Sequence, residues 1–216
     1  MHHRLSILTA FITAALALAG RAGAVAEDGE IRGLRVGVAA ASLPIAGFAD
    51  YACVASGAPI AGWSEQARCP PGADGLREVS ARYDEAAQPW AAVNDVWEGT
   101  KLAGHPVLLS VLFDADGRSQ AIRVVTDPKA RLFYRKKAFL LGIRIMGRYG
   151  RDGWTCAEDP PDPSRTPVGG MLIARQCEKE LPDRHLVLRT DLYRGAGQVG
   201  RDFTDATRFE IWRRTG

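Results

Sequence analysis

The sequence predicts an α+β protein whose main element is an antiparallel sheet, stapled by two disulfides. Three observations lead to this fold class. Short β-rich apolar runs recur along the chain and are separated by turn-forming residues. A single long helical stretch is predicted at Asp127–Tyr149. Four cysteines, an even number, follow an N-terminal export signal. The predicted order is a β-hairpin, one long helix and then a β-meander.

The composition is that of a folded protein. Of 216 residues, 46% are hydrophobic and 25% are charged, which is close to the average for globular domains. These values exclude a wholly disordered chain, a collagen-like repeat and a multi-span membrane protein. Without its leader the chain has about 190 residues, a length that suits one domain with a real core. We therefore predict a single α+β domain over 27–216.

Residues 1–26 have the layout of a secretory signal peptide. Met1–Arg4 is short and basic, Leu5–Ala19 is apolar, and small residues follow, so cleavage is expected after Ala24 or Ala26. An uncleaved membrane anchor is the alternative, but the apolar run is shorter than the roughly 20 residues that span a bilayer. The protein is therefore expected to be periplasmic or secreted, with no transmembrane segment after cleavage.

The four cysteines are predicted to be structural. Cys53, Cys69, Cys156 and Cys177 allow three pairings, of which Cys53–Cys69 with Cys156–Cys177 closes the shortest loops. A zinc site or a redox-active pair would be expected to use a Cys-x-x-Cys motif, and the sequence has none. No metal and no cofactor are therefore predicted.

The first half of the chain contains few clear elements. Leu34–Ala41 could form a first strand, and 42–75, rich in Gly, Ala and Pro, is predicted to be an irregular, disulfide-stapled region. Arg77–Tyr83 alternates as a half-buried strand does. Trp90 and Trp97 could lie on one face of a short helix. They would then be core residues or, alternatively, the wall of a ligand site.

The second half is more regular. Val107–Phe113 and Ala121–Thr126 flank a turn-forming segment and predict a β-hairpin. Asp127 followed by Pro128 suits the start of a helix, and Gly150 suits its end. Four more strands are predicted, at Gly153–Ala157, Met171–Glu178, His185–Tyr193 and Ala206–Arg213.

The helix carries most of the excess positive charge. The formal net charge is only +3, yet eight basic residues and no acidic one lie between Lys129 and Arg151. Without these eight, and without Arg4 and Arg21 of the leader, 18 basic residues face 25 acidic ones. The small net charge therefore conceals a strongly polarised molecule.

Helical geometry indicates which of these cations are exposed. Lys137, Arg144 and Arg148, at spacings of seven and four, share one face and are the candidate site for an anionic partner. That partner could be an anionic envelope component or an acidic protein. The alternative is a solvated face neutralised by the protein's own acids, and nucleic acid is not expected. Two apolar stripes should be buried: Leu132, Phe139, Ile143 and Met146, and Tyr134, Ala138, Leu141 and Ile145.

The sequence contains no Gly-x-Ser-x-Gly, Walker loop, His-Glu-x-x-His or Ser-x-x-Lys motif, and no catalytic residue is predicted. The two histidines beyond the leader, His105 and His185, each begin a predicted strand. The sequence therefore favours an exported, soluble, non-catalytic binding or envelope-accessory protein of unknown ligand. The alternative is an extracytoplasmic hydrolase with an unrecognised carboxylate or histidine site.

Overall fold

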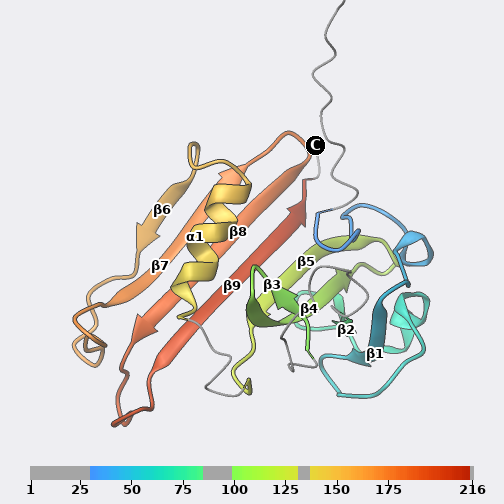
Figure 1. Ribbon diagram of the computed structural model, residues 1–216. Coiled ribbons are helices and arrows are strands. Elements are labelled where there is room, and N and C mark those ends of the chain that lie inside the picture. The colour runs from blue at the N-terminus through green and yellow to red at the C-terminus, as the bar shows by residue number, and fades with distance from the viewer. Residues whose placement is uncertain (1–29, 85–98, 131–136, 215–216) are drawn as a thin grey trace, which may run out of the picture.

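The computed structural model describes residues 30–84, 99–130 and 137–214, and these residues form one large sheet with a helix on one face (Figure 1). The sheet order is β1-β2-β4-β5-β9-β8-β7-β6, with β3 paired to β4, and all pairs are antiparallel. The strands are β1 (Phe48–Cys53), β2 (Arg77–Tyr83), β3 (Lys101–Leu102), β4 (His105–Phe113), β5 (Ser119–Thr126), β6 (Thr155–Glu158), β7 (Ile173–Glu180), β8 (Arg184–Tyr193) and β9 (Thr204–Arg213).

Helices are few in the described ranges. The α-helix α1 (Phe139–Arg148) lies against β8 and β9, and two 3-10 helices are η1 (Ala40–Ser42) and η2 (Trp63–Arg68). The α+β class with a mainly antiparallel sheet thus agrees with the structure at a coarse level, although the sheet dominates it. The strand predicted at Arg77–Tyr83 and the predicted hairpin are confirmed. The four later strands lie within a residue or two of their predicted bounds.

The strand predicted at Leu34–Ala41 is wrong. This segment forms isolated bridges and η1. Gly33 and Gly37 adopt φ of 79° and 80°, which interrupts an extended run on either side of Leu34. The stretch 42–75 is more regular than expected because it contains β1 and η2.

The predicted start of the long helix at Asp127 is also wrong. Asp127 instead ends the hairpin: its backbone N–H donates to the Pro106 carbonyl (3.0 Å), and its Oδ1 accepts from the Lys129 N–H (2.8 Å). This local bond closes a turn and competes with helical bonding. The helix is observed from Phe139, and the predicted stripe residues at 132 and 134 lie outside the described residues.

The core lies on the α1 side of the sheet. Alternate residues of β8 point into it, and Leu186 and Leu188 are buried with Leu141 and Ile145 of α1. In the other half of the same core Trp63 is 1% exposed. Its ring makes edge contacts with two others, Phe48 at 5.5 Å and Tyr51 at 4.9 Å, and a tilted contact with Phe113 at 6.4 Å.

Both predicted disulfides are confirmed. Cys53–Cys69 ties the end of β1 to the residue after η2, and Cys156–Cys177 joins directly paired residues of β6 and β7. Disulfides are typical of proteins in oxidising compartments. The described helices include none that is long and apolar enough to cross a bilayer. The predicted signal peptide and the Trp90–Trp97 helix lie outside the described residues.

Candidate anion-binding face

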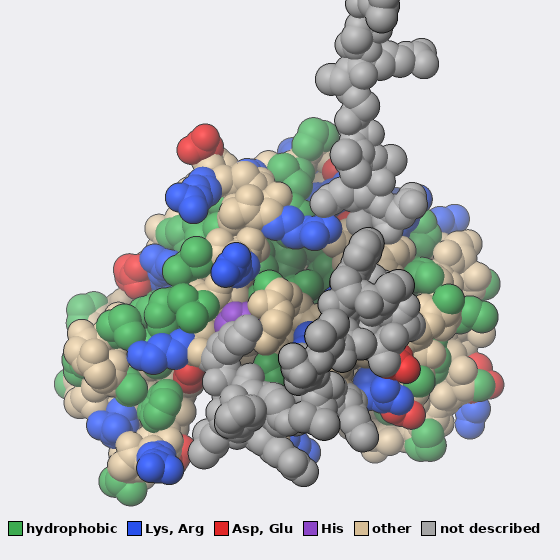
Figure 2. All heavy atoms as spheres, in the orientation of Figure 1, with side chains coloured by type: hydrophobic (Ala, Val, Ile, Leu, Met, Phe, Trp, Pro, Cys, Tyr) green, Lys and Arg blue, Asp and Glu red, His purple; other side chains and the backbone are tan. Residues whose placement is uncertain are grey.

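The three predicted site residues lie on and beside α1. Arg144 and Arg148 are exposed on the helix, and Lys137 is exposed two residues before it. Lys137 already belongs to the first helical turn through its carbonyl, which accepts from the Leu140 N–H (3.1 Å). We call Lys137, Arg144 and Arg148 the basic face. Figure 2 shows basic and hydrophobic side chains interspersed over the side of the molecule that carries α1.

Contacts with β9 hold the start of α1 in place and thereby set which side faces water. Asp205 Oδ1 accepts the backbone N–H of Ala138 (2.8 Å), and Thr207 Oγ1 donates to the Ala138 carbonyl (2.7 Å). Further along, a Cβ on Gly142 would come within 3.0 Å of Thr190 Oγ1 of β8, so the helix approaches the sheet closely there. The helix therefore cannot rotate its basic face inward without breaking these contacts.

Only one of the two predicted apolar stripes is buried where the structure describes it. Ala138, Leu141 and Ile145 are 2%, 0% and 3% exposed, whereas Ile143 of the other stripe is 49% exposed. Phe139 and Met146 of that stripe are half-buried, and Met146 packs against the core, so the sheet covers this stripe only in part. Leu140, which belonged to neither predicted stripe, is also 41% exposed.

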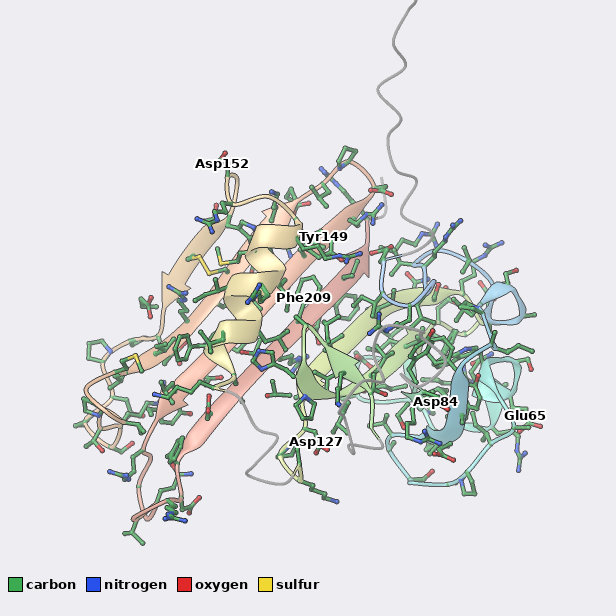
Figure 3. The ribbon with its side chains drawn as sticks, viewed as in Figure 1. Glu65, Asp84, Asp127, Tyr149, Asp152 and Phe209 are labelled. Carbon is green, nitrogen blue, oxygen red and sulfur yellow. A yellow bond between two sulfur atoms is a disulfide. The ribbon has the colours of Figure 1, made fainter. Side chains whose placement is uncertain are left out.

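The C-terminal end of α1 is capped by a lysine from β7. Lys179 Nζ donates to the carbonyls of Tyr149 (2.6 Å), Gly150 (3.1 Å) and Asp152 (2.7 Å). A cation here satisfies helix-end carbonyls and complements the helix dipole. Gly150 adopts φ of 82°, as predicted for a C′ glycine. Tyr149 packs on Phe209 of β9, with ring centroids 5.4 Å apart (Figure 3).

We expect Lys179→Met to lower the free energy of unfolding by about 1 kcal/mol, because the half-buried Tyr149 carbonyl and two exposed carbonyls lose a charged donor. Urea unfolding followed by circular dichroism measures this. Lys129→Met is the matched control, because Lys129 is an exposed lysine outside α1. Equal stability of the two variants would contradict the capping role.

Two members of the basic face have no acidic partner within the part of the chain that the structure describes. No carboxylate of the described residues lies within 4 Å of Lys137 or Arg144. Arg148 has its own contacts: Nη2 donates to the Glu30 carbonyl (3.3 Å), and its guanidinium lies 6.0 Å from the Tyr149 ring centroid. Among the described residues, the charges of Lys137 and Arg144 are therefore not compensated by a nearby carboxylate.

Elsewhere arginines are engaged by carboxylates. Arg189 donates to both oxygens of Asp159, at 2.5 and 2.6 Å, and Arg165 adds a third bond at 2.7 Å. Hydrogen bonds from Arg189 and then from Arg165 hold the pKa of Asp159 well below its ordinary value. This cluster lies on the opposite face of the sheet from α1, as the alternation of β8 requires.

The Asp159 cluster predicts a stability loss in acid. A carboxyl group whose pKa is lower in the folded state stabilises the fold fully above its unfolded pKa of about 4, and this contribution disappears as the pH falls through the folded pKa. We expect Asp159→Asn to flatten the dependence of the melting temperature on pH below about 4. Asp116→Asn, at the exposed β4–β5 turn, should leave that dependence unchanged. Identical curves for wild type and Asp159→Asn would contradict the prediction.

A cavity of about 510 Å³ opens beside the start of α1. It combines Lys137 and Arg201 with the carboxylates Asp127 and Asp205 and the ring of His105, which is 3% exposed. Sequence reasoning did not bring these residues together, because they come from β4, the β8–β9 loop, β9 and both ends of the connection between β5 and α1. Arg201 carried no sequence signal of its own.

The other candidate residues are more dispersed. His185 lies between two acids of β7, with Nδ1 2.7 Å from Glu180 Oε1 and Nε2 3.6 Å from Glu178 Oε2. Asp84 is exposed at the end of β2, on the other side of the molecule from α1 (Figure 3). Within the described ranges, no three His, Cys, Asp or Glu side chains are grouped so as to hold a metal ion.

The chain matches no protein-family model, no curated protein and no solved structure. Its structure combines an exposed basic face on a firmly anchored helix with a mixed-charge cavity at the start of the same helix.

Proposed function

We propose that the protein is an exported, non-catalytic binding or envelope-accessory protein, periplasmic or secreted, whose basic face meets an anionic partner. The two disulfides support a location outside the cytoplasm, since such bonds persist in oxidising compartments. The leader predicted at residues 1–26 supports the same location.

One observation carries the binding role. Lys137 and Arg144 are exposed without a carboxylate among the described residues, whereas arginines of the opposite sheet face are engaged in ion pairs. A merely solvated face would be expected to draw on the surplus acids of the rest of the chain. Unpaired cations on a fixed scaffold keep their charge available for a partner.

We expect reversal of Lys137, Arg144 and Arg148 to Glu to abolish binding to a polyanion. Binding of wild type to dextran sulfate beads should be salt-sensitive, because exposed charges are screened within about 10 Å at 0.1 M salt. The melting temperature should stay nearly fixed, since exposed charges contribute little to stability.

A charge-matched control reverses Arg68, Arg118 and Arg214, which are exposed outside α1. This variant has the same net charge as the first and should bind dextran sulfate far better. Equal loss in both variants would show that net charge alone matters, and the assignment of the basic face would then fail.

The cavity supports a second candidate, a hydrolase that uses His105 with Asp127 or Asp205. Both carboxylates already have structural bonds, Asp127 to the Lys129 N–H and Asp205 to the Ala138 N–H. The binding role is therefore favoured. An ester, phosphoester or glycoside hydrolysis that disappears in Asp127→Asn, with the melting temperature unchanged, would favour the enzyme instead.

A further inference from the structure

The basic face is interrupted by exposed aliphatic side chains. Leu140 is 41% exposed and Ile143 is 49% exposed, and both belong to α1. At 100° per residue, Leu140 lies within about 60° of Ile143 on one side and about 40° of Arg144 on the other. The solvent-facing side of the helix is therefore amphipathic in composition, with apolar residues next to cations.

Exposed aliphatic side chains next to cations restrict the kind of partner more than either feature does alone. Single exposed aliphatics are ordinary on protein surfaces, and a basic face alone could meet any anion. Leu140 and Ile143 lie one turn apart with Arg144 adjacent, so a partner that meets the cations also meets the aliphatics. The partner surface must therefore offer negative charge and an apolar phase within the reach of a side chain.

The outer side of α1 faces away from the sheet. α1 lies lengthwise on the sheet (Figure 1). The alternation of β8 places the Asp159 cluster on the other face. The inner side of α1 is held by Leu141, Ile145 and the Asp205 and Thr207 bonds. Lys137, Leu140 and Arg144 are exposed in the fold as it stands.

We propose that this side of α1 docks on an anionic phospholipid surface. Basic side chains would contact the phosphates while Leu140 and Ile143 enter the boundary between headgroups and acyl chains, as in helices that lie in a membrane interface. This inference rests on the proposed function, since it names the partner of the same basic face. An acidic protein would need a groove shaped for Leu140 and Ile143, whereas a lipid surface adapts to them.

The test compares vesicles with a soluble polyanion. The protein without residues 1–26 is tested in three assays. Two are flotation with vesicles, one kind made of equal parts phosphatidylcholine and phosphatidylglycerol and the other of phosphatidylcholine alone. The third is binding to dextran sulfate beads. We expect the protein to bind the vesicles that contain phosphatidylglycerol and not the vesicles of phosphatidylcholine alone. Leu140→Gln with Ile143→Gln should weaken vesicle binding by about tenfold or more, the worth of two half-buried aliphatics, and leave dextran sulfate binding unchanged.

Leu108→Gln is the matched control. Leu108 is a leucine 53% exposed on β4, and it alternates to the face opposite the core residues Leu109 and Val111. Its variant should bind vesicles as wild type does. Circular dichroism melts confirm that each variant is folded.

The outcomes separate the two proposals. Vesicle binding that is absent, or that is insensitive to Leu140→Gln with Ile143→Gln, overturns the lipid inference. Dextran sulfate binding that still depends on Lys137, Arg144 and Arg148 would then leave the anionic-partner proposal standing. Loss of that dependence as well would overturn both.

Discussion

Arg123→Met is expected to lower the free energy of unfolding by about 3–5 kcal/mol, the cost of breaking a buried ion pair by removing one partner. Arg123 on β5 lies between Glu78 of β2 and Glu210 of β9. Its Nη1 is 2.5 Å from Glu78 Oε2, and its Nε is 2.6 Å from Glu210 Oε1. The side chains are 18%, 19% and 7% exposed, so water compensates little for the lost cation. Urea unfolding measures the change.

A compensated variant isolates the electrostatic cause. Glu78→Gln and Glu210→Gln, added to Arg123→Met, remove the orphaned charges and should recover part of the lost stability. Arg208→Met is the exposed control: Arg208 also pairs with Glu210, at 2.5 Å, but is 50% exposed. Its loss should cost less than about 1 kcal/mol. A similar small cost for Arg123→Met would refute the assignment.

Removal of the Cys53–Cys69 disulfide is the second large effect. For the double alanine variant we expect a loss of about 3 kcal/mol from the chain-entropy term of a short loop. The loop that it closes carries Trp63, packed among Phe48 and Tyr51, and both sulfur-bearing residues are buried. Loosening this loop should therefore add a packing cost.

The second disulfide provides the comparison. Cys156–Cys177 closes a loop of similar length, with a sequence separation of 21 against 16, but β6 is an exposed edge strand. Its double alanine variant should lose about the entropic amount and a smaller packing cost, because Cys177 is buried but Cys156 is exposed. Thermal melts with and without reductant rank the two bonds. A larger loss from the Cys156–Cys177 variant would contradict the packing contribution of the Trp63 loop.

The proposals on function share a structural basis in α1. Its inner side is committed to β8 and β9, its C-terminal end to Lys179, and its start to Asp205 and Thr207. The outer side of α1 is therefore held in a fixed position, and binding of a partner there requires little further ordering of the helix. The anion-binding assignment of Lys137, Arg144 and Arg148 stays a prediction until the polyanion and vesicle experiments are done.

Sequence reasoning succeeded where the signal was local. The β4–β5 hairpin follows from apolar runs around a short turn, and the end of α1 follows from a glycine that tolerates φ of 82°. It failed at the start of α1, because Asp127 suits a helix N-terminus and a hairpin-ending turn equally well. The bond from the Asp127 N–H to Pro106 of β4 decided between these two conformations.

By itself, the sequence determined the strands of the second half, the disulfide pairing with the shortest loops and the concentration of basic residues along 129–151. These depend on neighbours within a few residues or on loop length. Only the tertiary structure decided which side of α1 is buried, that Leu140 and Ile143 are exposed among cations, and that Lys179 and Arg123 hold distant groups together. The reason is physical: each of these outcomes depends on which strands pair, and contacts between residues 30 to 87 positions apart leave no periodic signal in the chain.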